Sequence, residues 1–378
     1  MAHQLGGRPS PTRVLLASDF LIKYTTGLAG GLSEGGSSVA FLTRTHDLEF
    51  GGEHGAMRSY VRGALGERVS HIELAGRIRE LSGLRAVSRI RRSVSRFEPE
   101  VIHLQDAILT DPRLIVASRA RVGRYALTVH DPSRHPGGNP KRLRFELVRR
   151  VLIRAAGLIF VHAEALREEL IELEAPTAPV VVVPHGVSTP SFSAVPPQPS
   201  LLFFGRVLAY KGLDTLLDAM PLVWERAPDV RLTVAGEGTL PQHPVLRDER
   251  VNLRHEHIPE GDVAQLYEQS TCVVLPYRQA SQSGIGSLAK RHGRGMVVTR
   301  VGGLPELVSP DTGRVVQAEN PTDMARALIE IVTTRGLADS MGRASAASVA
   351  EGLDWKQVAA RTLDAYAQFL PARPQGRA

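Results

Sequence analysis

Leu201–Gly212, with the sequence LLFFGRVLAYKG, is the stretch that decides the fold. Its first four residues are apolar and Gly205 follows them, which is typical of a buried parallel strand. In open α/β sheets, ligands bind beyond the carboxyl ends of the strands. Arg206 and Lys211 are therefore predicted to lie beside a ligand, and two fixed cations suit an anion such as a diphosphate. From these residues alone, the alternative is that both cations are ordinary solvated loop residues.

A second stretch, CVVLPYRQASQSGI at residues 272–285, repeats the pattern of a buried strand followed by a loop. Helix-like sequence comes next, so the small residues Ser283 and Gly284 would lie at a helix N-terminus with Ile285. Backbone N–H groups at such a terminus attract anions. If the two loops face each other, these amides, Arg206 and Lys211 would enclose one diphosphate.

Both stretches belong to an ordered set of motifs that resembles the donor half of a retaining glycosyltransferase of the GT-B fold, in the large family 4 (group 1). The resemblance covers about residues 200–370, and the amino half fits the family more loosely. The motifs are Gly205-Arg206…Lys211-Gly212, Val234–Gly238, Leu275–Tyr277, Ser281–Gly284 and Val301–Glu306.

The resemblance implies an α/β chain of GT-B architecture, with two facing Rossmann-like domains, an interdomain cleft and a C-terminal cross-over helix. Residues 13–187 would form the acceptor-binding domain, and the proline- and serine-rich residues 188–200 the linker. Residues 201–353 would bind the nucleotide-sugar donor. A last helix, 354–370, would pack back on the first domain.

The resemblance also assigns roles around the donor, which is a co-substrate, so that no cofactor is expected. Arg206 and Lys211 would neutralise the charge that grows on the leaving diphosphate. Glu237 would accept hydrogen bonds from the ribose or base, unless its loop is a plain turn. The residues expected around the donor are Gly205, Gly236, Glu237, Gly238, Gln282, Ser283, Gly284, Ile285 and Glu306.

One departure from the family concerns a Glu-x7-Glu pair that most members carry. The corresponding positions here hold Ala280 and Leu288, neither of which can bind a hydroxyl group. The chain follows a minority Ser-Gln-Ser-Gly pattern, in which Gln282 would partly replace the first glutamate. Glu237 and Glu306 are then candidates for holding the ribose.

His130 comes at the carboxyl end of a predicted strand, 125–129. It is the residue that the first domain is expected to contribute to the catalytic site. The block 128–131 resembles the family's acceptor-side histidine motif, which implies contact with an acceptor or sugar hydroxyl rather than a general base. The alternative is a structural histidine. Thr26 and Gly27, in an expected loop 19–27, and Asp131 complete the acceptor-side prediction.

The 378-residue chain has a net charge of +7, which favours an anionic substrate, membrane surface or nucleic acid as partner. The helix predicted in residues 72–97 combines an apolar stripe with many arginines. It would pack on the sheet or bring the enzyme to a lipid-linked acceptor at an anionic membrane. No aromatic residues interleave the basic runs, which disfavours nucleic acid. Without a signal peptide or membrane-spanning run, the expected location is cytoplasmic, or peripheral at the inner face of the membrane.

No metal is expected, since His255 and His257, at i and i+2 of a predicted strand, lack a third ligand. The sequence thus predicts a metal-independent retaining glycosyltransferase of hexosyltransferase type. Its acceptor would be a glycan, a glycolipid or a small molecule, as in polysaccharide biosynthesis. A non-catalytic nucleotide- or glycan-binding protein on the same scaffold is the alternative. A phosphorylase or epimerase fits less well, because the additional acid–base groups or phosphate machinery are not found.

Overall fold

The computed structural model describes residues 13–44, 48–50, 55–74, 81–106, 112–118, 120–121, 123–133 and 143–370. These residues form two compact units. The first takes the described residues up to Ser133, those from 143 to Gly186, and those from Trp355 onward. The second takes Val187–Asp354.

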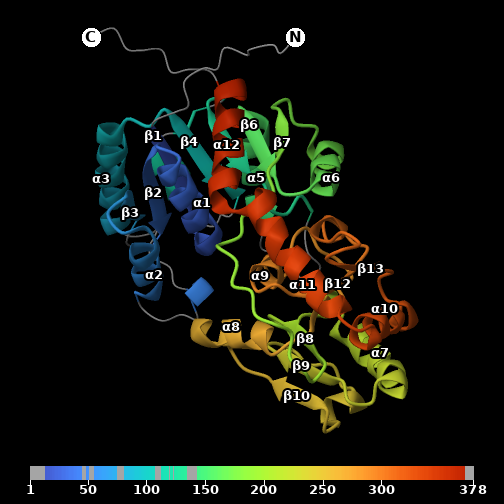
Figure 1. Cartoon of the computed structure of the whole chain (residues 1–378). Helices are drawn as coiled ribbons and strands as arrows, with labels where there is room; N and C mark the ends of the chain where they lie inside the picture. Colours follow the sequence, from blue (N-terminus) through green and yellow to red (C-terminus); the bar gives the residue numbers. More distant parts are fainter. Residues whose placement is uncertain are drawn as a thin grey trace, which may run out of the picture. The chain divides into compact units, whose positions relative to one another are not determined.

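Within the described residues, the first unit contains a seven-stranded parallel sheet in the order β3-β2-β1-β4-β5-β6-β7 (Figure 1). Its strands are β1 (Arg13–Ser18), β2 (Ser38–Arg44), β3 (Val69–Leu74), β4 (Val101–Gln105), β5 (Tyr125–Thr128), β6 (Leu158–Val161) and β7 (Val180–Val182). Its helices are α1 (Ile22–Glu34), α2 (Ala56–Leu65), α3 (Leu81–Phe97), α4 (Pro112–Ser118), α5 (Leu143–Ala155), α6 (Glu164–Glu174) and α12 (Trp355–Phe369).

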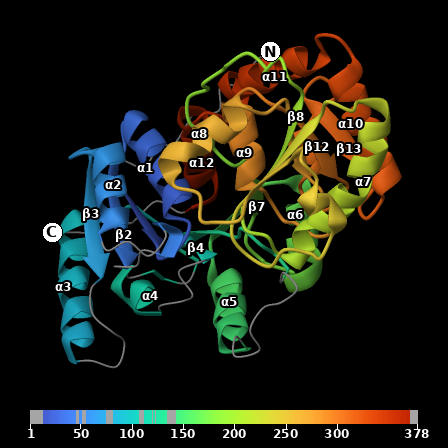
Figure 2. The same cartoon turned by 90° about the horizontal axis from the view of Figure 1, so that it is seen from below.

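Side chains alternate between the two faces of this sheet, as strand geometry requires. Val14 and Leu16 of β1 pack with α1, α2 and α12, whereas Leu15 and Ala17 pack with α3, α4, α5 and α6. Figure 2 shows α4 and α5 on the opposite side of the sheet from α1. The last helix, α12, thus completes the core of the first unit, as the sequence predicted.

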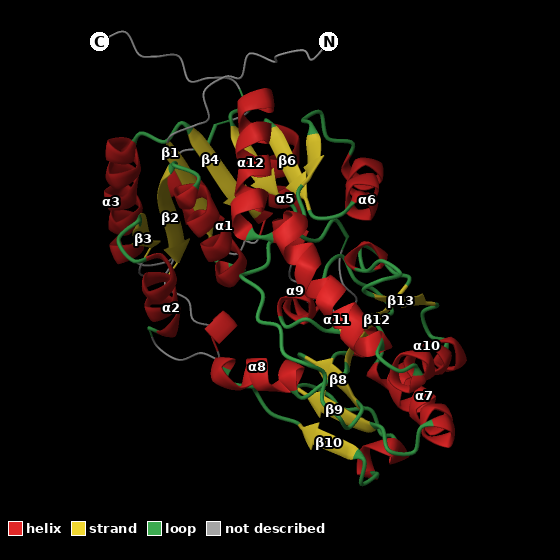
Figure 3. Ribbon diagram, viewed as in Figure 1, coloured by secondary structure: helices red, strands yellow, loops and turns green. Residues whose placement is uncertain are grey.

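The second unit contains a six-stranded parallel sheet, entirely within described residues, in the order β10-β9-β8-β11-β12-β13 (Figure 3). Its strands are β8 (Ser200–Phe204), β9 (Arg231–Ala235), β10 (Val251–Arg254), β11 (Cys272–Leu275), β12 (Gly295–Thr299) and β13 (Gly313–Val316). Its helices are α7 (Leu213–Arg226), α8 (Glu260–Glu268), α9 (Gly284–Arg291), α10 (Pro321–Thr333) and α11 (Leu337–Ser348). Short 3-10 helices include η4 (Ala209–Lys211) and η6 (Pro305–Leu307).

The expected loop 19–27 is wrong, because α1 already begins at Ile22. The Glu49 carboxylate accepts hydrogen bonds from the Ile22 and Lys23 amides, at 2.6 and 3.3 Å. A capping group 27 residues away in the chain is invisible to local sequence patterns, so the early start of the helix could not be predicted.

The expected helix over residues 72–97 is also wrong in its first part, since Ile72 lies in β3 and the described helix α3 begins at Leu81. Residues 75–80 lie outside the described residues. Ile90 and Val94 of α3 are buried in the core, as the packed-helix interpretation predicted. The buried apolar side of α3 is therefore not a membrane-binding face, although the arginines at 85, 89, 91, 92 and 96 are exposed.

The segment 188–200, expected as a linker, is held by the second unit. The Ser191 amide donates to the Arg291 carbonyl at 2.7 Å. The guanidinium of Arg294, which is fully buried, donates to the carbonyl and hydroxyl of Ser193, both at 2.6 Å. Proline and serine content alone indicated a linker, because nothing local in the sequence showed that a buried arginine 101 residues after Ser193 would bind this segment.

Candidate functional site

Two loops meet at the carboxyl ends of β8 and β11, neighbouring strands in the middle of the second sheet. A Cβ atom added to Gly205 would lie 3.0 Å from the Lys211 Nζ and 3.4 Å from the Cδ1 of Ile285. The ammonium group of Lys211 also lies 5.2 Å from the ring centroid of Tyr277. The structure therefore brings Gly205, Lys211 and the first turn of α9 together.

Lys211 is half-buried, whereas Arg206 is exposed. Burial and, as a smaller cause, the positive charge of Arg206 together lower the pKa of the Lys211 ammonium to about 8. Both effects penalise the charged lysine in the protein without a ligand. An anion bound between the two cations would remove the repulsion and favour the charged form.

The N-terminus of α9 contributes to the same region. Ser283 is its N-cap, and its side chain accepts a hydrogen bond from the Gly286 amide at 3.4 Å. A Cβ atom added to Gly284 would find no atom within 4 Å, so space beside the first helical residue is open. The partial positive charge of the helix terminus adds to that of the two cations.

The loop after β9 packs against the loop after β8. Gly236 has φ +139, and a Cβ atom there would lie 2.2 Å from the Gly205 carbonyl oxygen, so only glycine fits. The Val207 amide donates to the Glu237 carbonyl at 2.7 Å. The Glu237 side chain is exposed, and the carbonyl of Gly238 accepts a hydrogen bond from His255 Nε2 at 2.8 Å.

His255 and His257 follow β10 instead of lying in it, so the expected strand there is wrong. Among the residues that the structure describes, no group of three or more histidine, cysteine, aspartate or glutamate side chains could hold a metal ion.

The turn 301–306 lies against the loop that precedes α9. Gly302 has φ +48, and a Cβ atom there would lie 1.7 Å from the Ala280 carbonyl oxygen. The Gly303 amide donates to the Ser281 carbonyl at 3.1 Å. Glu306 is exposed and Gln282 is half-buried, while Leu288 packs on an apolar cluster. The two positions that depart from the family pattern are thus filled by apolar groups.

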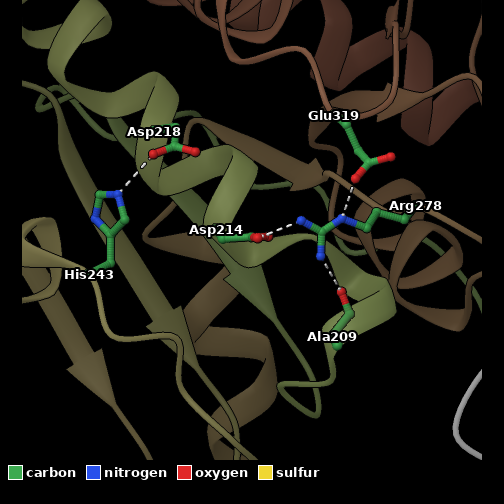
Figure 4. A network of polar contacts seen from close by, with 6 residues as sticks. All are labelled: Ala209, Asp214, Asp218, His243, Arg278 and Glu319. Atoms are coloured by element: carbon green, nitrogen blue, oxygen red, sulfur yellow. Dashed lines mark hydrogen bonds and ion pairs between the residues drawn. The ribbon is translucent and has the colours of Figure 1, made fainter.

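Arg278, which no sequence motif indicated, joins η4, the first turn of α7 and the loop before α10 (Figure 4). Its side chain binds the carbonyl of Ala209 and the carboxylates of Asp214 and Glu319. A single arginine in a loop carries no sequence signal for such a network, because its partners lie 41 to 69 residues away.

In the first unit, His130 belongs to a buried histidine cluster, defined here as His130, His162 and His185 around Tyr24. The three imidazole centroids lie 4.9 to 5.1 Å from that of the Tyr24 ring. These histidines come from the ends of β5, β6 and β7, which meet at one edge of the sheet.

The hydrogen bonds of the cluster determine its tautomers. His162 Nδ1 is 2.9 Å from the Val183 carbonyl, so this nitrogen donates and Nε2 of the neutral ring accepts. His130 Nδ1, 3.0 Å from that Nε2, is then the donor. The other nitrogen of His130 must then accept, so the Gln105 side-chain amide, 2.8 Å away, has to present its NH2 group to it. Both ring nitrogens of His130 are engaged within the protein, which favours the structural alternative over a direct contact with a sugar hydroxyl.

Burial keeps these rings neutral. It lowers the pKa of His162 to about 3, with the neighbouring His185 acting in the same direction. It also lowers the pKa of His130 well below its ordinary value. Asp106, whose carboxylate accepts from the His130 amide at 3.2 Å, has its pKa raised by burial to about 7.

Thr26 and Gly27, predicted on the acceptor side, lie inside α1. Thr26 is buried, and a Cβ atom added to Gly27 would lie 2.1 Å from Cε2 of the Trp355 ring. Gly27 thus allows the close approach of α1 and α12. Asp131 is exposed, and its carbonyl accepts a hydrogen bond from Arg149 at 2.9 Å.

Comparison with known proteins agrees with this division into two units. Residues 21–186 match the family model described as "Glycosyl transferase 4-like domain". Residues 198–334 match that described as "Glycosyl transferases group 1". The chain carries the two domains of a glycosyltransferase.

Two curated relatives match more than half of the chain at low sequence identity. The glycogen synthase of Mycobacterium tuberculosis is 24% identical over 289 residues, which covers 71% of this chain and 69% of that protein. The D-inositol 3-phosphate glycosyltransferase of Paenarthrobacter aurescens is 28% identical over 259 residues, covering 62% and 63% of the two chains.

Solved structures of glycosyltransferases share the fold over nearly the whole chain. The sucrose-phosphate synthase of Thermosynechococcus elongatus has a TM-score of 0.70 at 18% identity, and the match covers 94% of this chain and 98% of that one. Anabaena HepE, solved in complex with UDP-glucose, has a TM-score of 0.68 at 14% identity, with coverages of 94% and 99%. This glycosyltransferase chain therefore has the GT-B fold that the sequence predicted.

Proposed function

We propose that this protein transfers a sugar from a nucleotide-diphosphate sugar to a hydroxyl acceptor, with retention of anomeric configuration and without a metal ion. The observation that carries the proposal is the meeting of Lys211, Gly205 and Ile285 at the carboxyl ends of β8 and β11. A half-buried ammonium, a nearby guanidinium and a helix N-terminus together suit a diphosphate.

In the proposed reaction, the bond between the anomeric carbon and the diphosphate oxygen breaks, and its electron pair stays on the diphosphate. The acceptor oxygen bonds to the same face of the anomeric carbon, and its proton passes to a donor phosphate oxygen. Arg206 and Lys211 stabilise the charge that develops on the leaving group. Because this charge is larger in the transition state than in the bound substrate, the two cations lower the barrier in addition to binding the donor.

The related structures support a uridine nucleotide as the first donor to test, since Anabaena HepE was solved with UDP and with UDP-glucose. The curated relatives support sugar or sugar-like acceptors, since their names include a glycogen synthase and inositol 3-phosphate glycosyltransferases. A glycan and a small phosphorylated polyol are therefore the acceptors to test first, with a lipid-linked acceptor as a third class.

A non-catalytic binding protein is the second candidate, and one observation favours it. Ala280 and Leu288 are apolar, whereas most members of glycosyltransferase family 4 have glutamates at the corresponding positions. In the transferase account, Gln282, Glu237 and Glu306 take over the contacts to the ribose and sugar. In the binding account, the diphosphate site is kept and transfer is lost.

An assay of the full chain separates these candidates. UDP-glucose and other nucleotide sugars are incubated with each acceptor class in the presence of EDTA. Free nucleoside diphosphate is measured, and the product's anomeric configuration is read by NMR. We expect that nucleoside diphosphate is released only when an acceptor is present, and that an α-linked donor gives an α-linked product. Arg206→Ala should lose this release. Binding of a nucleotide without transfer to any acceptor would favour the second candidate.

The structure describes no helix long and apolar enough to cross a membrane, among the residues it covers. A cytoplasmic location, and contact of the exposed α3 arginines with an anionic membrane, are part of the proposal. Sedimentation with vesicles of anionic and of neutral lipids would test that contact.

A further inference from the structure

Arg278 directs three of its four described hydrogen bonds to residues that flank Lys211 in the chain. Its own amide donates to the Tyr210 carbonyl at 2.8 Å. Its Nη1 donates to the Ala209 carbonyl at 3.0 Å, and its Nη2 to the Asp214 carboxylate at 2.5 Å. Its Nε donates to Glu319 at 2.9 Å, and Figure 4 shows the guanidinium lying among these groups.

The segment that carries Lys211 has few hydrogen bonds of its own. Helix η4 is a single 3-10 turn of three residues. The Lys211 amide donates to the Leu208 carbonyl at 2.9 Å, and the Gly212 amide to the Ala209 carbonyl at 3.2 Å. Such short turns have poor hydrogen-bond geometry and depend on their surroundings for a fixed position.

Those surroundings are supplied by three consecutive residues after β11. A Cβ atom added to Gly212 would lie 2.1 Å from the Pro276 carbonyl oxygen, so the turn presses directly on the strand end. The Tyr277 ring lies beneath the Lys211 ammonium, and Arg278 binds the residues just before it. The residues on both sides of Lys211 are therefore fastened to the same short loop.

We propose that Arg278 is a positioning residue: it fixes η4 against the end of β11 and thereby sets the place of the Lys211 ammonium. Its Nε, Nη1 and Nη2 atoms each donate to a protein oxygen, and two carboxylates face it, so Arg278 acts through Lys211 instead of binding the anion. The link to a diphosphate rests on the proposed function, whereas the positioning itself rests on the contacts of Arg278.

Arg314 on β13 offers a matched control. It binds the Glu330 carboxylate and the carbonyls of Pro310 and Gly313, so it also joins a carboxylate to main-chain oxygens. The two arginine side chains are similarly exposed, at 32% for Arg278 and 27% for Arg314. Arg314 contacts none of the segments that hold Lys211.

Hydrogen–deuterium exchange of the protein without ligand tests the positioning. In Arg278→Ala we expect the amides of residues 208–212 to exchange about tenfold faster, because local opening of the turn becomes easier. Arg314→Ala should leave this segment unchanged. Equal exchange of residues 208–212 in the wild type and in Arg278→Ala would overturn the proposal, whatever the protein binds.

Calorimetric binding of UDP tests whether Arg278 acts through Lys211. Arg278→Ala should weaken binding about tenfold in the wild-type background, but by less than about twofold when Lys211 is already alanine. Equal losses in both backgrounds would overturn the proposal, because they indicate a general structural role. If the wild type binds no nucleoside diphosphate, the proposed function fails, and the exchange experiment still decides the positioning.

For transfer, a positioning role predicts that Arg278→Ala lowers kcat more than it raises KM for the donor. Misplacement of Lys211 is felt most in the transition state, where the diphosphate charge is largest. An increase of KM at unchanged kcat would contradict this role.

Discussion

In the first unit, three neutral histidine rings pack around Tyr24 and two of them, His130 and His162, hydrogen-bond to each other. In the second unit, Lys211 and Arg206 hold like charges beside each other. The histidine rings find hydrogen-bond partners within the protein. The two cations instead repel each other, and burial together with this repulsion lowers the pKa of Lys211. Polar groups at strand ends are thus held by protein partners in the first unit, whereas those of the second unit are the groups that we propose to bind a diphosphate.

Loss of Lys211 should have the largest effect on activity. We expect Lys211→Ala to lower the transfer rate about 10²–10³-fold, as found when one preorganised group is removed from a charged transition state. Release of nucleoside diphosphate at saturating donor measures this effect.

Lys356→Ala is the control, because Lys356 is an exposed lysine of α12. If both lysine variants transfer equally well, the contrast between the two units is lost, since the second unit would then hold no catalytic cation.

At mildly acidic pH, the first unit should lose stability before the second unit does. Five described histidines of the first unit have a lowered pKa, and the second unit has His292, whose pKa burial lowers to about 4. Those of the first unit are His71, His103, His130, His162 and His185.

A histidine with a lowered folded pKa stabilises the fold fully above its unfolded pKa of about 6.5, and this contribution falls as the pH decreases. Asp106, with its pKa raised to about 7, works in the opposite direction and offsets about one histidine. The three most buried histidines outnumber Asp106, so the first unit should lose stability as the pH falls below about 6.

Hydrogen exchange of peptides from both units, at pH 7.5, 6 and 5, measures this loss. The first unit should lose protection first. His257→Gln, which removes an exposed imidazole of the second unit, should not change the profile. Earlier loss of protection in the second unit would contradict the neutral state of the cluster.

Arg294 should matter for the stability of the second unit and not for its chemistry. Its buried guanidinium donates to the carbonyls of Tyr267, Glu268 and Ser193. Arg294→Met would leave these oxygens without their donor and should destabilise the second unit by about 3 kcal/mol. Calorimetry should show a lower melting temperature for this unit alone, with Arg326→Met, an exposed arginine, as the control. Unchanged melting would mean that water replaces the guanidinium without cost.

Tyr366→Phe should have the smallest effect. The Tyr366 hydroxyl lies 2.6 Å from His103 Nδ1, and the other nitrogen of that ring lies 2.6 Å from the Thr128 hydroxyl. Removing one hydrogen bond should lower the free energy of unfolding of the first unit by about 1 kcal/mol. Urea unfolding, followed by a signal from the first unit, measures this change. If Tyr366→Phe lowered the free energy of unfolding of the second unit instead, α12 would belong to a different core.

Patterns of the sequence predicted the strands and many helices because these depend on local apolar spacing. The buried strands predicted at the start of the two motif stretches are β8 and β11, and the loops after them lie together at one sheet edge. These loops could be found because strand, glycine and cation occur within twelve residues of sequence.

The remaining parts of the site depend on contacts between distant segments. Thr26 and Gly27 lie inside a helix because Glu49 caps it from far away in the chain. The pairing of His130 with His162 joins the ends of two strands, and Arg278 joins a loop to η4 and α7. Local composition carries no information on which of these polar side chains satisfy one another.

Binding of a nucleoside diphosphate in EDTA tests the central claim most directly. The melting temperature of the second unit is followed with UDP, GDP, ADP and TDP, for the wild type and Arg206→Ala. The account predicts that one of them, at 100 times its Kd, stabilises the wild type by about 2.7 kcal/mol without metal, and that Arg206→Ala loses this gain. Stabilisation that requires a divalent cation, or that is equal in Arg206→Ala, would contradict it.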